Sequence, residues 1–211
     1  MSKTRGNVLD PFAVMDQYGI DALRFYCFRE VTFGLDGVIS LEGFESRYNN
    51  ELANELGNLV SRSVSMVAKY RDGRVPAAQG IAAVAAEAEA MILCEGERLD
   101  AGEITPAIEA VWTFVRRLNR LVEEEAPWKL AKDETQAGRL DDVLFSLAAG
   151  LRLVALALYP LIPGTAIEIL RRLGQPSEAD DLRLNAALWN GFVPGTVESA
   201  APLFPRSETK G

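Results

Sequence analysis

The feature that most constrains this fold is an apolar stripe with helical spacing between residues 40 and 71. Large apolar side chains recur three or four residues apart, or at the sum of these spacings, at Phe44, Tyr48, Leu52, Leu56, Leu59, Met66 and Tyr70. This spacing places them on one face of an α-helix, so we expect one long helix with that face buried. Ser40 is a typical N-cap, and Arg71-Asp72-Gly73 predicts the end of the helix.

The remaining helical patterns are shorter, and no segment of any length has the two-residue period of a strand. Asp10-Pro11 predicts a helix start, with Asp as N-cap and Pro at the first helical position. Asp21 is placed to cap the helix after it, and Thr165 to Glu168 has the pattern of a capping box. The expected helices cover residues 12–17, 22–30, 76–93, 105–126 and 140–159. The expected fold class is all-α, an antiparallel helix bundle preceded by a short junction of helix and loop.

The chain contains no histidine and only two cysteines, Cys27 and Cys94, which lie far apart in the sequence. These counts exclude a Cys/His zinc site within this chain, as well as Ser-His-Asp and Cys-His catalysis. Cys27 lies among aromatic residues, so we interpret it as a buried thiol. Two unpaired cysteines favour a reducing, cytoplasmic setting.

The most apolar stretch, residues 144–167, is interrupted by Arg152 and broken by Pro160 and Pro163. It therefore predicts a core helix, and no membrane partner is expected. The net charge is −8, which by itself disfavours a nucleic-acid partner, because phosphate binding needs Lys and Arg. A local basic face can still act within an acidic protein.

Several stretches carry longer motifs. Residues 1–8 read MSKTRGNV, residues 33–37 read FGLDG, residues 47–59 read RYNNELANELGNL, residues 126–132 read APWKLAK, and residues 202–206 read PLFPR. Residues 1–8 resemble the KMSKS loop of methionyl-tRNA synthetases, and residues 33–37 and 47–59 together resemble the junction between the catalytic and anticodon modules of this family. Residues 126–132 resemble its anticodon-contacting corner, and residues 202–206 its C-terminal end. The first lysine of the KMSKS motif is missing here, and its last serine is Thr4.

The resemblance implies that this is the tRNA-recognition part of a class I methionine–tRNA ligase, which attaches methionine to its tRNA with ATP and Mg. The implied division is a KMSKS-loop remnant and junction over 1–40, a helical anticodon-binding domain over 41–189, and an irregular tail over 190–211. The adenylate-forming domain would lie before Met1. We therefore expect the chain alone to be inactive and to bind no ATP, and we expect its partner to be the tRNA(Met) anticodon stem-loop.

The site residues follow from the same resemblance. Ser2 and Lys3 match the KMSKS loop, whose lysine faces the ATP phosphates as charge builds up during adenylate formation. Asn58 and Arg62, four residues apart on one helix face, match residues that contact anticodon bases, and Trp128 matches the tryptophan that stacks on a base. No metal ligand is implied. Without the resemblance, Asn58 and Arg62 would be interpreted as a solvated face and Trp128 as a half-buried structural residue.

Two questions stay open at the level of sequence. Arg116, Arg117 and Arg120 either face tRNA phosphates or pair with Glu123 and Glu124. The competing functions are the same region of a class I synthetase for leucine, isoleucine, valine or cysteine, and a stand-alone helical protein-interaction module. The motifs at 47–59 and 126–128 favour methionine, whereas the net charge favours the interaction module.

Overall fold

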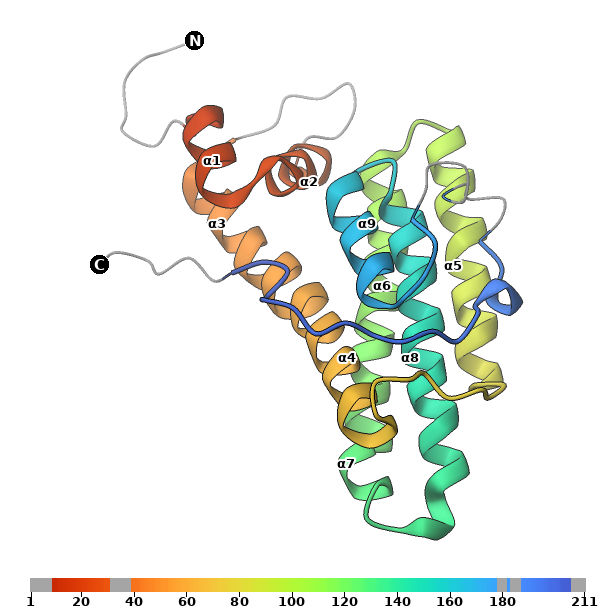
Figure 1. Ribbon diagram of the computed structural model, residues 1–211. Helices are drawn as coiled ribbons and strands as arrows, with labels where there is room; N and C mark the ends of the chain where they lie inside the picture. The colour runs from red at the N-terminus through yellow and green to blue at the C-terminus, as the bar shows by residue number, and fades with distance from the viewer. Residues whose placement is uncertain (1–8, 31–38, 178–181, 183–186, 206–211) are drawn as a thin grey trace.

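The structure, a computed structural model, describes residues 9–30, 39–177, 182 and 187–205 (Figure 1). Ser2 and Lys3, and the motif at 33–37, lie outside the described residues. The described elements are α1 (Pro11–Tyr18), α2 (Ile20–Glu30), α3 (Leu41–Arg47), the π-helix η1 (Tyr48–Gly57), α4 (Asn58–Arg71), α5 (Ala82–Asp100), α6 (Ile104–Glu125), α7 (Pro127–Leu130), the 3-10 turn η2 (Glu134–Gln136), α8 (Ala137–Leu158), α9 (Pro163–Arg172) and the 3-10 turn η5 (Trp189–Gly191). The only β pairing within these ranges is an isolated bridge between Arg74 and Thr196, so the all-α prediction is confirmed.

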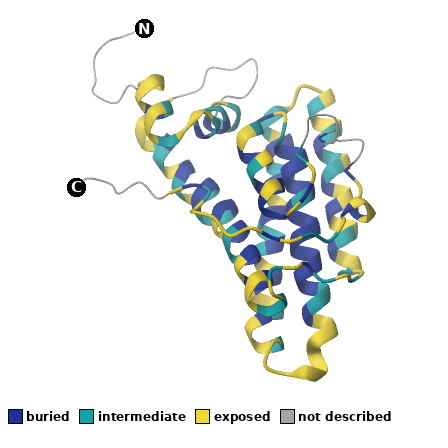
Figure 2. Ribbon diagram, viewed as in Figure 1, coloured by how far each residue is buried: buried dark blue, intermediate teal, exposed yellow. Residues whose placement is uncertain are grey.

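The core of the bundle is α8, which packs against α5, α6 and α9 and is buried along most of its length (Figure 2). The first two helices pack on one end of the long helical element formed by α3, η1 and α4 (Figure 1). The Tyr18 ring lies 4.9 Å from Phe44 and 4.8 Å from Tyr48, and the Phe25 ring lies 4.6 Å from Trp112 of α6. Aromatic packing therefore joins the junction helices to both the long element and the bundle.

The long helix predicted over residues 40–71 exists, and its predicted apolar face is buried except at Tyr70, which is half-buried. Ser40 caps its start, because its Oγ accepts a hydrogen bond from the Gly43 N–H at 3.1 Å. The prediction of a regular α-helix is wrong in the middle, where Tyr48–Gly57 forms π-helix. The Asn58 N–H accordingly donates to the Ala53 carbonyl, five residues back. Long π segments are rare and often occur at functional positions.

Two predicted helix starts are wrong, and long-range contacts explain both. The helix expected from Pro76 begins instead at Ala82 and runs past Gly96 to Asp100. The preceding segment is held extended, because the Ile81 N–H donates to Ser146 Oγ at 2.8 Å. Asp21 lies inside α2 and accepts a hydrogen bond from the Thr165 N–H at 2.5 Å, so it satisfies the first turn of α9.

The capping box predicted at Thr165 to Glu168 does not form either. The helix α9 begins earlier, at Pro163, and Glu168 forms ion pairs with Arg171 and Arg172. The interpretation of Cys27 as a buried thiol is also wrong, since this residue is exposed. No helix of the described ranges is long and apolar enough to cross a membrane.

Candidate nucleic-acid interface

Asn58 and Arg62 lie on the first turns of α4, directly after the π segment. Asn58 is exposed, and the Arg62 side chain is 41% exposed. The Arg62 guanidinium is not free: its Nη2 donates to Glu123 Oε1 of α6 at 2.7 Å. This pair is exposed, and such pairs contribute only about 0–1 kcal/mol to stability. A nucleotide base that displaced Glu123 from the Arg62 guanidinium would therefore disturb the fold little.

A second contact sets the register between α6 and the long helical element. The Asn119 side chain donates to the carbonyl of Glu55 at 3.0 Å and to that of Val115 at 3.1 Å. Together with the Arg62–Glu123 pair, this contact places the last turns of α6 beside the junction of η1 and α4. Trp128 follows Glu123 by only five residues, so the helix break at Pro127 comes at the end of this contact region.

Trp128 is presented by a backbone break between α6 and α7. Ala126 has a left-handed conformation (φ 43°), which costs a residue with a Cβ about 1–2 kcal/mol. Its N–H donates to Val122 at 3.1 Å and its carbonyl accepts from Lys129 at 2.7 Å, so both backbone groups stay paired through the break. Pro127 then begins α7. Trp128 is 40% exposed, which leaves part of its indole available to a stacking partner.

The other two tryptophans of the chain differ from Trp128. Trp112 and Trp189 are buried in the core, at 0% and 4% exposure. Trp128 is therefore the only tryptophan of the chain with a substantial exposed surface. This contrast is the structural difference expected between a packing residue and a recognition residue.

The three arginines of α6 whose roles the sequence left open have different partners in the structure. Arg116 pairs with Glu109 and lies 3.7 Å from Glu55, so it faces the long helical element. Arg117 pairs with Glu87 of α5 at 2.8 Å and with Glu124 at 3.4 Å.

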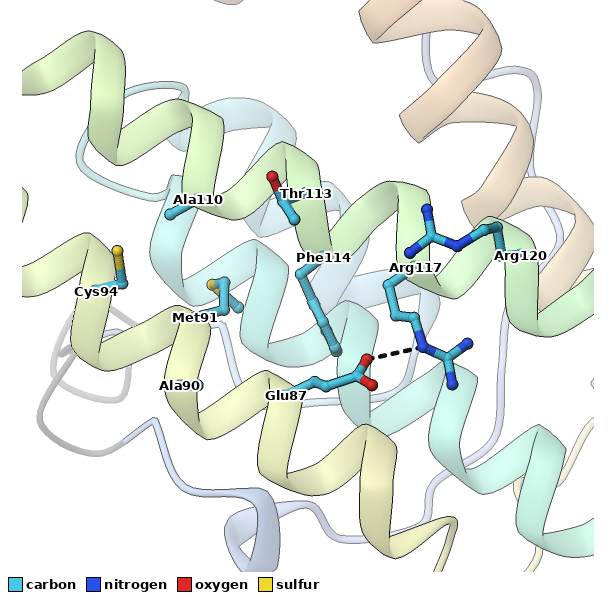
Figure 3. Close-up of a pocket in the computed structure, with 9 residues that line it drawn as sticks. All are labelled: Glu87, Ala90, Met91, Cys94, Ala110, Thr113, Phe114, Arg117 and Arg120. Atoms are coloured by element: carbon cyan, nitrogen blue, oxygen red, sulfur yellow. Dashed lines mark ion pairs between the residues drawn. The ribbon is translucent and has the colours of Figure 1, made fainter.

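Figure 3 shows the Arg117–Glu87 pair across a cavity of about 510 Å³ between α5 and α6. The walls of this cavity include Met91, Cys94 and Phe114. Arg120 lines the same cavity, is exposed, and forms no ion pair with any residue in the described ranges (Figure 3).

A charged network that the sequence did not predict joins α2 and α6 to the π segment. Arg29 of α2 lies 3.1 Å from Glu51 and also pairs with Glu109 of α6. Arg47 pairs with Glu51 at 2.6 Å, which extends the network along the long element. Burial opposes ionisation of Glu109, but hydrogen bonds from Arg29 and Arg116 outweigh it and lower the pKa of this carboxyl.

The network also has an incompletely satisfied member. Burial raises the pKa of Glu55, and Glu55 Oε2 has no hydrogen-bond partner in the part of the chain that the structure describes. Within the described residues, no group of three or more acidic, Cys or His side chains is placed to hold a metal ion. The ion pairs of this network link α2 and α6 to η1, directly before the start of α4, which carries Asn58 and Arg62.

Comparisons with known proteins support the resemblance. The family model described as "tRNA synthetases class I (M)" matches residues 1–64. The methionine–tRNA ligase of Listeria monocytogenes is 39% identical over 223 residues, which cover 100% of this chain and 33% of that protein. The ligase of Bacillus subtilis is 36% identical over 215 residues, which cover 100% of this chain and 32% of that protein.

A solved structure agrees with the sequence matches. Mycobacterium tuberculosis methionyl-tRNA synthetase in complex with methionyl-adenylate superposes with a TM-score of 0.87 at 37% identity, covering 98% of this chain and 41% of that chain. The chain thus spans about a third of the length of the curated relatives it matches. With its whole length matched at this identity and its helical fold shared, the chain belongs to the methionyl-tRNA synthetases, as a region of that class I family.

Proposed function

We propose that this chain is the tRNA-recognition part of a methionine–tRNA ligase and that Asn58, Arg62 and Trp128 read the CAU anticodon. The observation that carries the proposal is the exposed Trp128 at a helix break, five residues beyond the carboxylate that holds Arg62. Anticodon bases are unstacked, so an exposed indole can stack on one of them while amide and guanidinium groups contact base edges. The relatives named above are all methionine–tRNA ligases, which favours methionine over leucine, isoleucine, valine or cysteine.

The catalytic part of the proposal concerns the longer protein. Ser2 and Lys3 act in the KMSKS loop, where the lysine ammonium stabilises the charge that develops on the ATP phosphates. The adenylate-forming domain that binds ATP and Mg is a separate part of the enzyme, and this chain alone is inactive. A cytoplasmic location and the division at residues 40 and 189 belong to the same proposal.

The junction helices offer a surface for that domain. Phe12 is 72% exposed and Ile20 is 61% exposed, and both lie at the end of the molecule formed by α1 and α2. Ile39 and Leu41, at the start of α3, are also exposed, at 45% and 39%. Exposed large apolar side chains are typical of a docking surface where they lie together.

The test of the anticodon proposal is Trp128→Ala, measured by binding of stem-loops with CAU and with other anticodons. Stacking on an aromatic side chain contributes about 1–3 kcal/mol per base, so CAU binding should weaken by roughly tenfold or more. Binding of the other stem-loops should change little, because those complexes lack the specific contacts.

The matched control is Phe12→Ala, which removes an exposed aromatic ring from α1, outside the candidate site. It should leave CAU binding unchanged. If the two variants bind the CAU stem-loop equally well, or if the unaltered chain binds all anticodons alike, the assigned roles of Asn58, Arg62 and Trp128 are wrong.

A further inference from the structure

Most cationic side chains that the structure describes are neutralised by carboxylates. Ion pairs engage Arg29, Arg47, Arg62, Arg71, Arg98, Arg116, Arg117, Arg139, Arg171 and Arg172. Because the net charge is −8, such pairing is expected, and a cation left without a carboxylate partner is the exception. The positions of these exceptions indicate where the protein can attract an anion.

Two of the exceptions hold the fold together. Arg24 donates to the carbonyls of Leu161 and Pro160, and Arg152 donates to the carbonyl of Leu188. The other described cations without an ion pair are Lys69, Arg74, Arg120, Lys129 and Lys132. All five are exposed, so their charges face solvent.

Three of these five cations lie on the helices that carry or adjoin the candidate anticodon site, α4, α6 and α7. Lys129 is the next residue after Trp128, and Arg120 lies on α6 one turn before Glu123. Lys69 lies seven residues after Arg62, which is two turns along the same face of α4. The end of α4 reaches the start of α8, just beyond α7, because Arg71 lies 2.6 Å from Asp141 (Figure 1).

The other two cations are set apart. Arg74 lies in the segment that pairs with Thr196, and Lys132 is followed directly by the carboxylates of Asp133 and Glu134.

The acidic turn beside these cations is neutralised. Glu123, Glu124 and Glu125 end α6 and would repel RNA if their charges were free. Each has an arginine partner: Arg62 pairs with Glu123, Arg117 with Glu124, and Arg139 with Glu125. Because these three carboxylates are paired, Lys69, Arg120 and Lys129 are the cations near this turn that have no carboxylate partner among the described residues.

We infer that Lys69, Arg120 and Lys129 form a phosphate-binding set that positions an anticodon stem-loop on the surface around Trp128. The inference rests on the proposed function and adds a separate role to it. Contacts with phosphates fix the position and orientation of a nucleic acid, whereas contacts with bases provide specificity. These three cations therefore control affinity for every stem-loop, and Asn58, Arg62 and Trp128 control the choice of anticodon.

The salt dependence of binding tests this inference. With about 0.7 counterions released per phosphate contact, three contacts give a slope of about 2 in a plot of log affinity against log salt. Affinity should then fall roughly 20-fold between about 50 and 200 mM salt. Arg120→Gln should reduce that fall to about 7-fold, and the triple variant with Lys69→Gln and Lys129→Gln should nearly abolish it. Each variant should affect CAU and other stem-loops equally.

Arg98→Gln is the matched control for charge. It removes one exposed arginine that is already paired, with Glu103, and it changes the net charge by the same amount. It should leave the slope unchanged. The inference is overturned if Arg120→Gln leaves the slope unchanged, or if Arg98→Gln lowers it as much.

The two proposals fail in different ways. If Trp128→Ala still abolishes the preference for CAU while the slope does not respond to the three cations, only the phosphate set is wrong. If the cations control the slope but all anticodons bind alike, the surface binds RNA and the anticodon assignment is wrong. If no stem-loop binds at low salt, both are wrong.

Discussion

Glu95 is a carboxylate in the core of the bundle, and its substitution should change the pH dependence of stability. It lies on the buried face of α5, in line with Val84, Ala88 and Met91. The residue is 0% exposed, and neither carboxylate oxygen has a hydrogen-bond partner among the described residues. The nearest sequence neighbours of the same charge, such as Glu97, are exposed. An ionised carboxylate in such surroundings is costly, because no charge or donor replaces its lost hydration.

Burial raises the pKa of Glu95 from 4.5 to about 7. In the unfolded chain the carboxyl ionises near its ordinary pKa, so between these two values the folded state holds a proton that the unfolded state has released. The free energy of unfolding therefore falls as pH rises from about 4.5 to about 7, and the loss is complete above that range. The displacement of the pKa corresponds to about 3 kcal/mol in total, of which about 2 kcal/mol is lost between pH 5 and pH 8.

The measurement is urea unfolding of the unaltered chain and of Glu95→Gln at pH 5 and pH 8. The amide cannot ionise, so the variant should gain about 2 kcal/mol relative to the unaltered chain on going from pH 5 to pH 8. Other titrating groups are shared by the two proteins and cancel in this difference. Glu97→Gln, two residues along the same helix, should show no such gain. A difference between Glu95→Gln and the unaltered chain that is the same at both pH values would refute the reasoning.

Two further substitutions test the packing. Leu56→Ala removes a fully buried side chain from the predicted apolar face and should cost about 2–5 kcal/mol in unfolding experiments, whereas a cost below about half a kcal/mol would place it at the surface. Gly80→Ala should destabilise by more than about 1 kcal/mol, because Gly80 has φ +73° and an added Cβ would lie 2.9 Å from Phe145 and from Ser146 Oγ. Gly138→Ala is its control: with nothing within 4 Å of the added Cβ, it should be neutral or stabilising.

The sequence could predict the helices and the buried face of the longest one because both depend on local spacing. Leu52 and Leu56 are four residues apart, a spacing compatible with α-helix and with the wider π-helix, so the pattern could not identify the π segment. The start of α5 depends on hydrogen bonds to Asp142 and Ser146, which are 62 and 65 residues away from their partners. Asp21 looked like a cap for its own helix, but its partner is Thr165, 144 residues away.

For the candidate site as well, the sequence could predict the local features but not the long-range contacts. Trp128 and the break at Pro127 could be placed from the sequence, since a proline interrupts a strong helical pattern there. The ion pair between Arg62 and Glu123 could not be predicted from the sequence, because it joins residues 61 positions apart. The resemblance to a family identified the candidate residues, and the structure showed which of their charged groups already form ion pairs.

The acidic net charge of the chain therefore does not decide whether it binds RNA. A charge of −8 counts every carboxylate, including Glu123, Glu124 and Glu125, each of which pairs with an arginine from a different element. What a phosphate experiences near Trp128 is the field of the nearby charges that remain unpaired, because charges beyond about 10 Å are screened at ordinary salt. If that field comes from Lys69, Arg120 and Lys129, a protein that repels RNA over most of its surface can still attract it at one place. The repulsion elsewhere would then favour a single docking position over nonspecific binding.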